Sequence, residues 1–232
     1  MGYPGRKKRS KPGRDRHVDH MTAEALLRIL SFEVESLNYT LPDNSLPRLV
    51  EYVQLLEKWN TVYNLTSVRD KAQMVYRHIL DSLVVSPFLQ GQRCLDVGSG
   101  AGLPGIPLAI VNPEREFTLL DSNLKKTRFI QQAVGELGLT NVTVVTERIE
   151  EFHSEVTYDT VTARAYSAIE NLINGVEHLI HAESVILAMK GTYPIAELEN
   201  IPSGYHVESI ENLQVPGLDA ERHLVIIKRE QG

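Results

Sequence analysis

A glycine-rich segment near the middle of the chain has the residue types and spacing to bind a cofactor through its backbone. Residues 95–105 read LDVGSGAGLPG, with glycines at every second position from Gly98 to Gly102. Glycine adopts positive φ angles without strain and lets a ligand approach the backbone closely. The free N–H groups at the start of a following helix can then meet polar groups of the ligand. The segment therefore predicts a cofactor loop between a first strand and a first helix.

Two cofactor classes compete for this loop. Residues 100–105 match the G-x-G-x-x-G pattern of dinucleotide-binding proteins, which alone is a weak signal. Residues 96–102 also match the acidic-x-Gly-x-Gly-x-Gly loop typical of S-adenosylmethionine methyltransferases. The register favours the methyl donor, because dinucleotide glycines would begin directly at the end of the strand. The charge favours it too, because Asp96 suits a cationic cofactor and would be awkward beside a pyrophosphate.

A second carboxylate supports an adenosine ligand of either class. Asp121 ends the second expected strand, 19 residues after Gly102. A carboxylate at that position can accept hydrogen bonds from the ribose hydroxyls of an adenosine cofactor. Asp121 could also be the N-cap of the next helix, and the two roles are compatible.

The elements that position these residues follow from hydrophobic periodicity. Apolar residues recur at helical spacing over residues 26–37 and 46–56, and a third helix is expected over about 70–85. From residue 93, short β-rich runs alternate with helical ones, which predicts an α/β fold with a mostly parallel sheet covered on both faces. The last two runs are separated by Pro-Gly and no helix, which predicts an antiparallel edge. The expected strands are 93–97, 116–120, 142–145, 157–163, 184–189, 204–210 and 223–228, with helices at 124–137 and 168–180.

Charge is distributed unevenly along the chain. The whole sequence has 24 Lys+Arg against 30 Asp+Glu, a net charge of −6, whereas residues 1–20 alone hold seven cations and two anions. The remaining 212 residues therefore carry −11, and so acidic a body must bind any nucleic acid through a local cationic patch. Residues 1–20 are rich in Gly and Pro, so we expect a disordered leader. A non-native extension is favoured over a natural RNA-binding tail.

Composition excludes several kinds of protein. The lone cysteine, Cys94, rules out a disulfide framework and a cysteine-cluster metal site. No run approaches the roughly 18 apolar residues that a membrane helix needs, so we expect a soluble, cytoplasmic protein without a membrane partner. His78 and Asp81 lie three residues apart, but a metal site needs more ligands than this pair, and we predict no metal. We interpret the pair as a hydrogen-bonded strut between a cap of N-terminal helices and the sheet, with a place in the lining of the active site as the second choice.

Several further blocks occur in the order that one known family shows. The blocks are WN at 59–60, YNLT at 63–66, RHILDS at 77–82, residues 96–107, LLDS at 119–122, KG at 190–191, VPGL at 215–218 and ERHL at 221–224. In these blocks the chain resembles the bacterial small-subunit (16S) ribosomal RNA guanine-N7 methyltransferases, also called glucose-inhibited division protein B. The resemblance covers about residues 21–229.

The resemblance implies a fold, a reaction and a domain organisation. The implied fold is a Rossmann-like class I methyltransferase sheet behind an N-terminal helical cap. The implied reaction moves a methyl group from S-adenosyl-L-methionine to N7 of one guanine in 16S ribosomal RNA. We therefore divide the chain into a leader (1–20), a helical cap (21–90) and an S-adenosylmethionine-binding domain (91–232). The expected partner is 16S ribosomal RNA or the small ribosomal subunit, and we expect the protein to be a monomer.

Candidate site residues come from the loop chemistry and from the resemblance. The resemblance implies cofactor contacts at Gly98, Leu103, Ile149, Glu150 and Arg164, to which the loop chemistry adds Asp96, Gly100, Gly102 and Asp121. Arg164 ends the fourth strand, and we assign it a positioning role in catalysis, with a structural ion pair as the alternative. The chain departs from the family in reading SNLKK at 122–126 in place of SLGKR, and ARAY at 163–166 in place of SRAF.

Cationic residues near the loop are candidates for RNA contacts. The candidates are Lys125, Lys126, Arg128, Lys190 and Arg222. Three of them follow Asn123 at the start of a helix, where cations oppose the helix dipole. This placement is mild support for binding, and an ordinary solvated helix face remains an equal alternative. Trp59, Tyr63 and Asn64 could stack on RNA bases, but we favour a buried aromatic joint under the cap.

The implied chemistry agrees with the residues. Guanine N7 carries an exposed lone pair, so its methylation needs no general base and depends on positioning and electrostatics. No Asp-Pro-Pro-Tyr-like block, which an exocyclic-amine methyltransferase would usually show, follows the fourth strand. Pyrimidine C5 methylation normally needs a cysteine nucleophile, and Cys94 falls inside a strand, where a buried apolar role is favoured. Two other functions stay open from the residues alone. They are an NAD-dependent oxidoreductase, suggested by residues 100–105, and a non-catalytic cofactor-binding regulatory protein.

Overall fold

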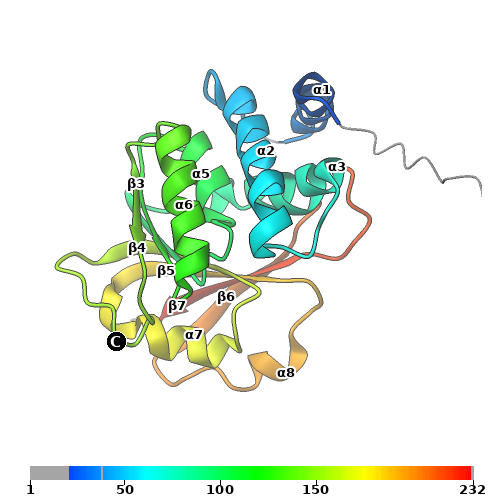
Figure 1. Cartoon of the computed structure of the whole chain (residues 1–232). Helices are drawn as coiled ribbons and strands as arrows, with labels where there is room; N and C mark the ends of the chain where they lie inside the picture. Colours follow the sequence, from blue (N-terminus) through cyan, green and yellow to red (C-terminus); the bar gives the residue numbers. More distant parts are fainter. Residues whose placement is uncertain (1–20, 38, 231–232) are drawn as a thin grey trace, which may run out of the picture.

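Seven strands form one sheet in the order β3-β2-β1-β4-β5-β7-β6 in the computed structural model, which describes residues 21–37 and 39–230 (Figure 1). The strands are β1 (Arg93–Val97), β2 (Glu116–Leu120), β3 (Val142–Val145), β4 (Tyr158–Arg164), β5 (Ile180–Lys190), β6 (Tyr205–Asn212) and β7 (His223–Arg229). β1 to β5 are parallel, and β7 is antiparallel to both β5 and β6. This confirms the predicted mostly parallel sheet with an antiparallel edge. The predicted leader lies outside the described residues.

The predicted helices are present, but two of them differ in detail, and one short helix at 195–198 was not predicted. They are α1 (Ala23–Val34), α2 (Ser45–Tyr63), α3 (Lys71–Met74), α4 (Asp81–Leu83), α5 (Gly105–Val111), α6 (Leu124–Glu136), α7 (Ile169–Val176) and α8 (Ile195–Leu198). The third predicted helix is continuous in space, but its middle is a π-helix, Val75–Leu80. The expected helix 168–180 ends earlier, at Val176, because a single 3₁₀ turn, Glu177–Leu179, leads directly into β5.

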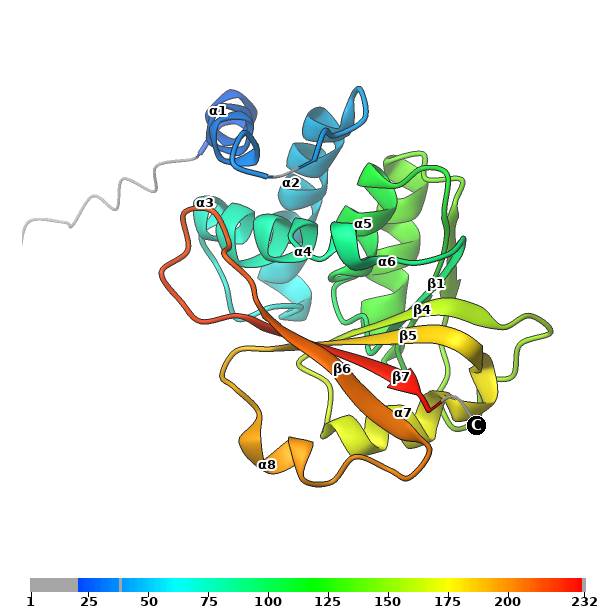
Figure 2. The ribbon, with the colours of Figure 1, turned by 180° about the vertical axis from the view of Figure 1, so that it is seen from behind.

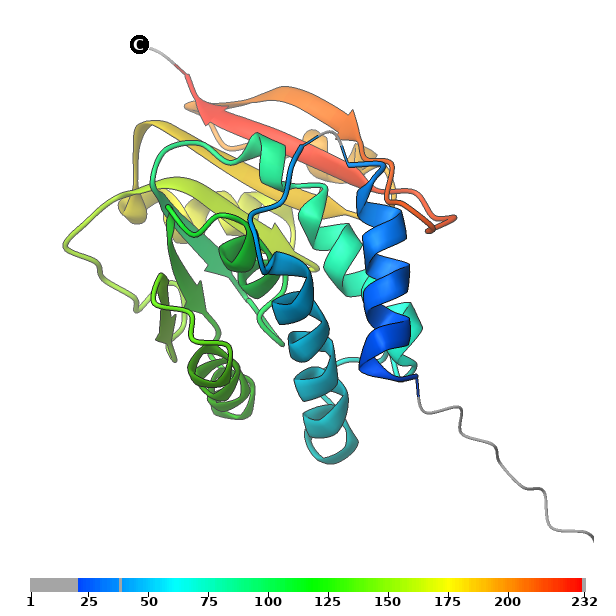
Figure 3. The same cartoon turned by 90° about the horizontal axis from the view of Figure 1, so that it is seen from above.

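The helices cover both faces of the sheet. Figure 1 shows α1 to α3, α5 and α6 on one side and α7 and α8 on the other, and Figure 2 gives the view from behind. α1 and α2 lie side by side (Figure 3). Successive side chains of a strand point to opposite faces, so Leu119 joins the cluster under the cap and Leu120 the cluster under α7. The cap cluster is continuous from Leu26 of α1 to Leu187 of β5, so the cap helices and the sheet share one core.

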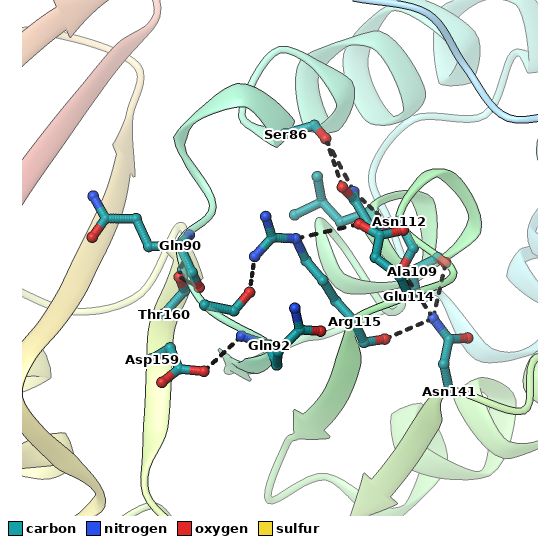
Figure 4. Close-up of polar contacts among 12 residues, drawn as sticks. Ser86, Gln90, Gln92, Ala109, Asn112, Glu114, Arg115, Asn141, Asp159 and Thr160 are labelled. Atoms are coloured by element: carbon teal, nitrogen blue, oxygen red, sulfur yellow. Dashed lines mark hydrogen bonds and ion pairs between the residues drawn. The ribbon is translucent and has the colours of Figure 1, made fainter.

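A polar network closes the amino-terminal edge of the sheet (Figure 4). The Asp159 carboxylate accepts hydrogen bonds from the backbone N–H groups of Gln92 and Arg93 at 2.7 and 2.8 Å. Asn141 Nδ2 donates to the carbonyl oxygens of Ala109 and Arg115 at 3.1 and 3.0 Å. These contacts bind the ends of the loops that precede β1, β2 and β3. The opposite, carboxyl edge carries the candidate site.

Replacing Asn141 with alanine is expected to lower the free energy of unfolding by about 1–3 kcal/mol, because buried carbonyl groups lose their donor. Asn141 Nδ2 also lies 3.3 Å from the carbonyl oxygen of Asn112, so one side chain contacts three carbonyl groups between the end of α5 and the start of β2. Urea unfolding measures the effect, with the exposed neighbour Thr140→Ala as the control. Equal stability of the two variants would contradict the assignment.

Candidate functional site

The glycine loop leaves β1 and is held against the end of β2. The N–H groups of Gly98 and Ser99 both donate to the carbonyl oxygen of Leu120, at 2.8 and 3.1 Å. The N–H of Gly100 donates to Asp121 Oδ2 at 2.8 Å. Gly98 has a φ of +67°, and a Cβ there would lie 2.9 Å from Cδ2 of Tyr166. The loop therefore needs glycine at 98 both for its backbone angle and for its close approach to Tyr166.

Asp96 stabilises the loop from behind. Its side chain is buried, and Oδ1 accepts from the Thr162 hydroxyl at 3.0 Å, while Oδ2 accepts from the N–H of Gly105 at 3.0 Å. Burial raises the pKa of this carboxyl to about 6, although the hydrogen bonds that it accepts lower the pKa. Asp96 is 1% exposed and lines neither of the two cavities beside the loop, so it braces the loop, and the direct cofactor contact expected from the sequence stays a prediction. Gly102 also has a structural role in the loop, because a Cβ there would lie 2.6 Å from Cδ1 of Ile106.

The Asp96 carboxyl makes stability depend on pH in a defined direction. Its folded-state pKa of about 6 lies above the ordinary value of 3.8, so the folded chain binds the proton more tightly. The stability from this group is present at low pH and is lost as the pH rises through 6. The asparagine side chain of Asp96→Asn has nearly the shape of aspartate, but it does not ionise between pH 5 and pH 7. We expect the unfolding free energy of the wild type, relative to Asp96→Asn, to fall by roughly 1 kcal/mol from pH 5 to pH 7. Urea unfolding of both proteins at pH 5 and pH 7 measures this change. An unfolding free energy of the wild type, relative to Asp96→Asn, that rises with pH would contradict the prediction.

Two adjoining cavities flank the loop. The first, of about 300 Å³, is lined by Val97, Gly98, Leu120, Asp121, Ser122, Lys126, Glu147, Arg148, Ile149, Glu150, Ala165 and Tyr166. The second, of about 180 Å³, is lined by Leu65, Thr66, Gly98, Ser99, Gly100, Ala101, Leu103, Lys126, Arg164 and Ala165. They share Gly98, Lys126 and Ala165. Asp96 and Gly102 line neither cavity, whereas the other seven predicted cofactor residues line at least one.

Asp121 faces the first cavity while holding the loop. Oδ1 accepts from the N–H of Asn123 and Oδ2 from the N–H of Gly100, both at 2.8 Å. The ammonium of Lys126 lies 3.8 Å from Oδ2. The N-cap of α6 is Asn123, whose side chain accepts from the N–H of Lys125, so the alternative role of Asp121 as N-cap is wrong. Asp121 lies two residues before Asn123 and acts on the loop instead.

A third cavity, of about 440 Å³, lies between the cap, the end of β4 and the β6–β7 loop. Thr66, Arg164 and Ala165 belong to both this cavity and the second one. Arg164 Nη1 lies 3.2 Å from Asp81 Oδ2, so the ion pair weighed as an alternative for Arg164 is present. The same side chain lines two cavities, so the ion pair and a role in the site coexist.

The strut expected from His78 and Asp81 is only partly correct. Asp81 links the cap to the sheet through Arg164, but His78 pairs with Thr66 of the cap. His78 Nδ1 lies 2.9 Å from the carbonyl oxygen of Arg77, so Nδ1 carries the proton and Nε2 accepts from the Thr66 hydroxyl at 2.8 Å. Burial lowers the pKa of His78 to about 4, which keeps the ring neutral at pH 7.

The five predicted RNA-contact cations fall into two groups. Lys125, Lys126 and Arg128 lie on the first turns of α6, where Lys125 and Arg128 are exposed. Lys190 and Arg222 line the third cavity, and both have intramolecular partners. The Lys190 ammonium lies 2.7 Å from Glu197, and Arg222 Nε lies 2.6 Å from Asp81.

The aromatic residues at the end of α2 do not form one buried joint. Trp59 is half-buried, with its ring centroid 5.7 Å from that of Phe129. Tyr63 stacks on Trp59 at 5.2 Å but is 44% exposed. The predicted joint is therefore correct for Trp59 and wrong for Tyr63, because Tyr63 occupies the last turn of the helix, beyond the packed core.

Sequence reasoning missed several residues that line the site. They are Thr66, Ser122, Glu147, Arg148, Ala165 and Tyr166. Most follow a strand end directly, which is the signal that could have identified them; Thr66 arrives from the cap and had no such signal. In the described ranges, no cluster of three or more His, Cys, Asp or Glu could hold a metal ion. Nor is any helix of residues 21–37 and 39–230 long and apolar enough to cross a membrane.

Comparisons with known proteins agree with this architecture. The family model described as rRNA small subunit methyltransferase G (GidB) matches residues 45–225. The ribosomal RNA small subunit methyltransferase G of Shigella flexneri is 49% identical over 203 residues, which are 88% of this chain and 98% of that protein. The protein of the same name from Serratia proteamaculans is 51% identical, over 84% of this chain and 95% of its own length.

A solved structure supports the fold alone. The structure of an S-adenosylmethionine-dependent methyltransferase from Aquifex aeolicus has a TM-score of 0.52 at 16% identity, over 67% of this chain and 93% of that chain. The family model, by contrast, extends from α2 across the glycine loop to β7. The chain therefore belongs to the rRNA small subunit methyltransferase G (GidB) family.

Proposed function

We propose that the chain transfers a methyl group from S-adenosylmethionine to N7 of a guanine in small-subunit (16S) ribosomal RNA, acting as a cytoplasmic monomer. The observation that carries the proposal is the continuity of the three cavities along the carboxyl edge of the sheet. The first and second share Gly98 and Ala165, and the second and third share Arg164 and Ala165. A cofactor in the first two cavities would thus present its reactive group to the third.

The residues of the first two cavities fit S-adenosylmethionine. The first holds the carboxylates of Asp121 and Glu150, which can accept hydrogen bonds from ribose hydroxyls and an adenine amine. The second is lined by loop backbone from Gly98 to Ala101, which suits the polar end of a methionine. Gly98 lines both cavities, and a Cβ there would lie 2.9 Å from Cδ2 of Tyr166, which lines the first. When bound, the cofactor supplies a methyl group already activated by a sulfonium.

The same geometry disfavours a dinucleotide. In that alternative, a pyrophosphate would bind the N–H groups at the start of α5. The N–H of Gly105 is already engaged by Asp96 Oδ2 at 3.0 Å. A carboxylate there would also repel a pyrophosphate, since the group is mainly ionised above a pKa of about 6.

The chain's own residues contribute position and charge. The N7 lone pair attacks without loss of a proton, so no general base is required. His78, which lines the third cavity with Arg164, is neutral and engaged at both nitrogens. Arg164 lines both the second and third cavities, so its guanidinium can orient the base against the methyl group.

The direct test is methyl transfer from radiolabelled S-adenosylmethionine. Free 16S RNA, intact small subunits and assembly intermediates from a strain that lacks the enzyme serve as parallel substrates. We expect label in RNA that migrates as 7-methylguanosine after nuclease digestion. Label in another nucleoside, or no label in any substrate, would overturn the proposal.

A further inference from the structure

Two further cavities adjoin at the carboxyl end of α1, away from the glycine loop. One, of about 680 Å³, is lined by residues between Val34 and Pro47. The other, of about 410 Å³, lies between the α1–α2 connection, residues 84–88 and the end of β6. Figure 3 shows the carboxyl end of α1 beside the end of β6. Leu37 and Tyr39 line both cavities, so we treat the two as one groove, the cap groove.

The floor of the cap groove is apolar and only partly covered by the protein. Its half-buried side chains pack against the core under the cap, and they are Leu37, Val84 and Phe88. Tyr39 holds the α1–α2 connection beside this floor, because its hydroxyl donates to the carbonyl oxygen of Leu83 at 2.8 Å. Phe32 is 72% exposed and lies one helical turn before Glu35, which lines the groove. Apolar surface that stays open to solvent in this way favours a partner that covers it.

The rim of the cap groove is acidic. The three segments that line the groove, residues 34–47, 84–88 and 211–214, contain three carboxylates and no Lys, Arg or His. The carboxylates are Glu35, Asp43 and Glu211. None of them forms an ion pair with another residue of 21–37 or 39–230. The groove therefore presents uncompensated negative charge, which attracts a cationic partner.

This charge decides between the possible occupants of the groove. RNA would bring its phosphates against the three carboxylates, which costs free energy. A second copy of the chain, related by two-fold symmetry, would bring the same acidic groove against itself, and like charges would again face each other. A basic peptide fits both features, because its apolar side chains can cover the floor while its Lys and Arg side chains face the rim.

The groove ends at an edge strand, which favours an extended peptide. β6 is the last strand in the sheet order and pairs with β7, and within the described residues its outer edge has no strand neighbour. Such an edge presents backbone N–H and C=O groups that an extended segment can pair with. Glu211 and Asn212, the last residues of β6, line the groove. One extended segment can therefore follow the groove and continue along β6.

We propose that the cap groove binds an extended, Lys/Arg-rich segment of a protein of the small ribosomal subunit. The choice of partner rests on the proposed function, because a particle that carries the substrate RNA also carries proteins. Proteins that are held on a polyanion are rich in Lys and Arg. The contact adds affinity for the assembled subunit that free 16S RNA cannot supply.

The first experiment neutralises the rim and reads the sign of the effect. The rim variant carries Glu35→Gln, Asp43→Asn and Glu211→Gln, and the matched control neutralises three exposed carboxylates elsewhere. The control substitutions are Glu136→Gln, Glu155→Gln and Glu183→Gln. Anisotropy of the fluorescently labelled protein measures its Kd for purified small subunits and for free 16S RNA. For the rim variant we expect the small-subunit Kd to rise about tenfold. Its Kd for free RNA should not rise, because losing negative charge does not weaken binding to phosphates.

The second experiment identifies what occupies the groove. Gln214 is exposed and lines the groove, so Gln214→p-benzoylphenylalanine places a photoreactive group there. Val156→p-benzoylphenylalanine, at an exposed residue before β4, is the control. Both proteins are irradiated with purified small subunits, and the products are identified by mass spectrometry. We expect position 214, and not position 156, to cross-link to a Lys/Arg-rich segment of a subunit protein.

Each outcome decides the proposal. A small-subunit Kd that is unchanged or lowered in the rim variant would overturn it, and so would an equal rise in the control. Cross-linking of position 214 to RNA, to a second copy of the chain or to nothing would also overturn it. If the rim variant does not fold, Phe32→Ser replaces it, because its exposed side chain can be removed without opening the core, and an unchanged Kd would again overturn the proposal. If the wild type methylates no RNA, the proposed function fails, whereas the Kd values and the cross-links still decide what the groove binds.

Discussion

Replacing Arg164 with alanine is expected to lower methyl transfer to small-subunit RNA by roughly 10²–10³-fold, the usual loss when one preorganised donor of a reaction site is removed. The guanidinium lies between the second and third cavities and is 22% exposed. Its loss removes the contact expected to orient the guanine, and it leaves Asp81 with one partner in place of two. Single-turnover methylation measures the chemical step separately from RNA binding.

The matched control for this variant is Arg229→Ala. Arg229 is 31% exposed, donates to the Tyr205 hydroxyl at 3.1 Å, and lies at the end of β7, away from the three cavities. Both variants lose a partly buried arginine, so a stability effect alone would appear in both. Arg164→Lys keeps the charge but not the forked donors, and we expect an intermediate rate. A fully active Arg164→Ala enzyme that still complements a methylation defect would show that Arg164 has no role in the reaction.

Replacing Gly98 with alanine is expected to raise the Kd for S-adenosylhomocysteine by at least about tenfold, which corresponds to about 1.4 kcal/mol. Gly98 has a φ of +67°, and the added methyl would lie 2.9 Å from Cδ2 of Tyr166. Tyr166 lines the first cavity, so its displacement changes the walls that the cofactor meets. The loop must also change its φ or carry strain of roughly 1–2 kcal/mol. Calorimetry with S-adenosylhomocysteine measures the affinity.

Gly138→Ala separates the strain from the close approach. Gly138 follows α6 with a φ of +61°, and nothing lies within 4 Å of the position where a Cβ would be. Both substitutions carry similar strain at positive φ, so we expect similar losses of thermal stability. Only Gly98→Ala should weaken cofactor binding. Equal affinities in the two variants would show that the loop does not hold the cofactor through this glycine.

Local patterns were enough to predict the first half of the sheet. The expected strands 93–97, 116–120 and 142–145 agree with β1, β2 and β3 residue for residue, because each is a short apolar run flanked by polar or turn residues. β5 begins at Ile180, four residues earlier than expected, since His181 and Glu183 make the segment before residue 184 too polar to signal a strand. The π-helix could not be predicted either, because apolar spacing does not distinguish a widened turn from an α-helical one.

The residues of the site also differ in whether the local sequence could predict them. Gly100 and Asp121 were predicted from one short segment and one strand end, and Gly98 and Leu103 from the family resemblance. All four line the first two cavities. Asp96 was also singled out, but its direction depends on Thr162 of the neighbouring strand, and only the pairing of β1 with β4 turns it inward.

Two kinds of property therefore have different origins in this chain. The order of strands and helices, the cofactor loop and its positive-φ glycines depend on interactions among residues close in sequence, and the sequence by itself determined them. The division of the cations between α6 and the third cavity, and the assembly of Arg164, Asp81 and Arg222, depended on the tertiary structure. Asp81 and Arg222 are 141 residues apart, and their 2.6 Å contact exists because the cap and the β6–β7 loop pack on one core. An ion pair between residues that are distant in sequence forms only when the packing of their elements brings the two opposite charges together.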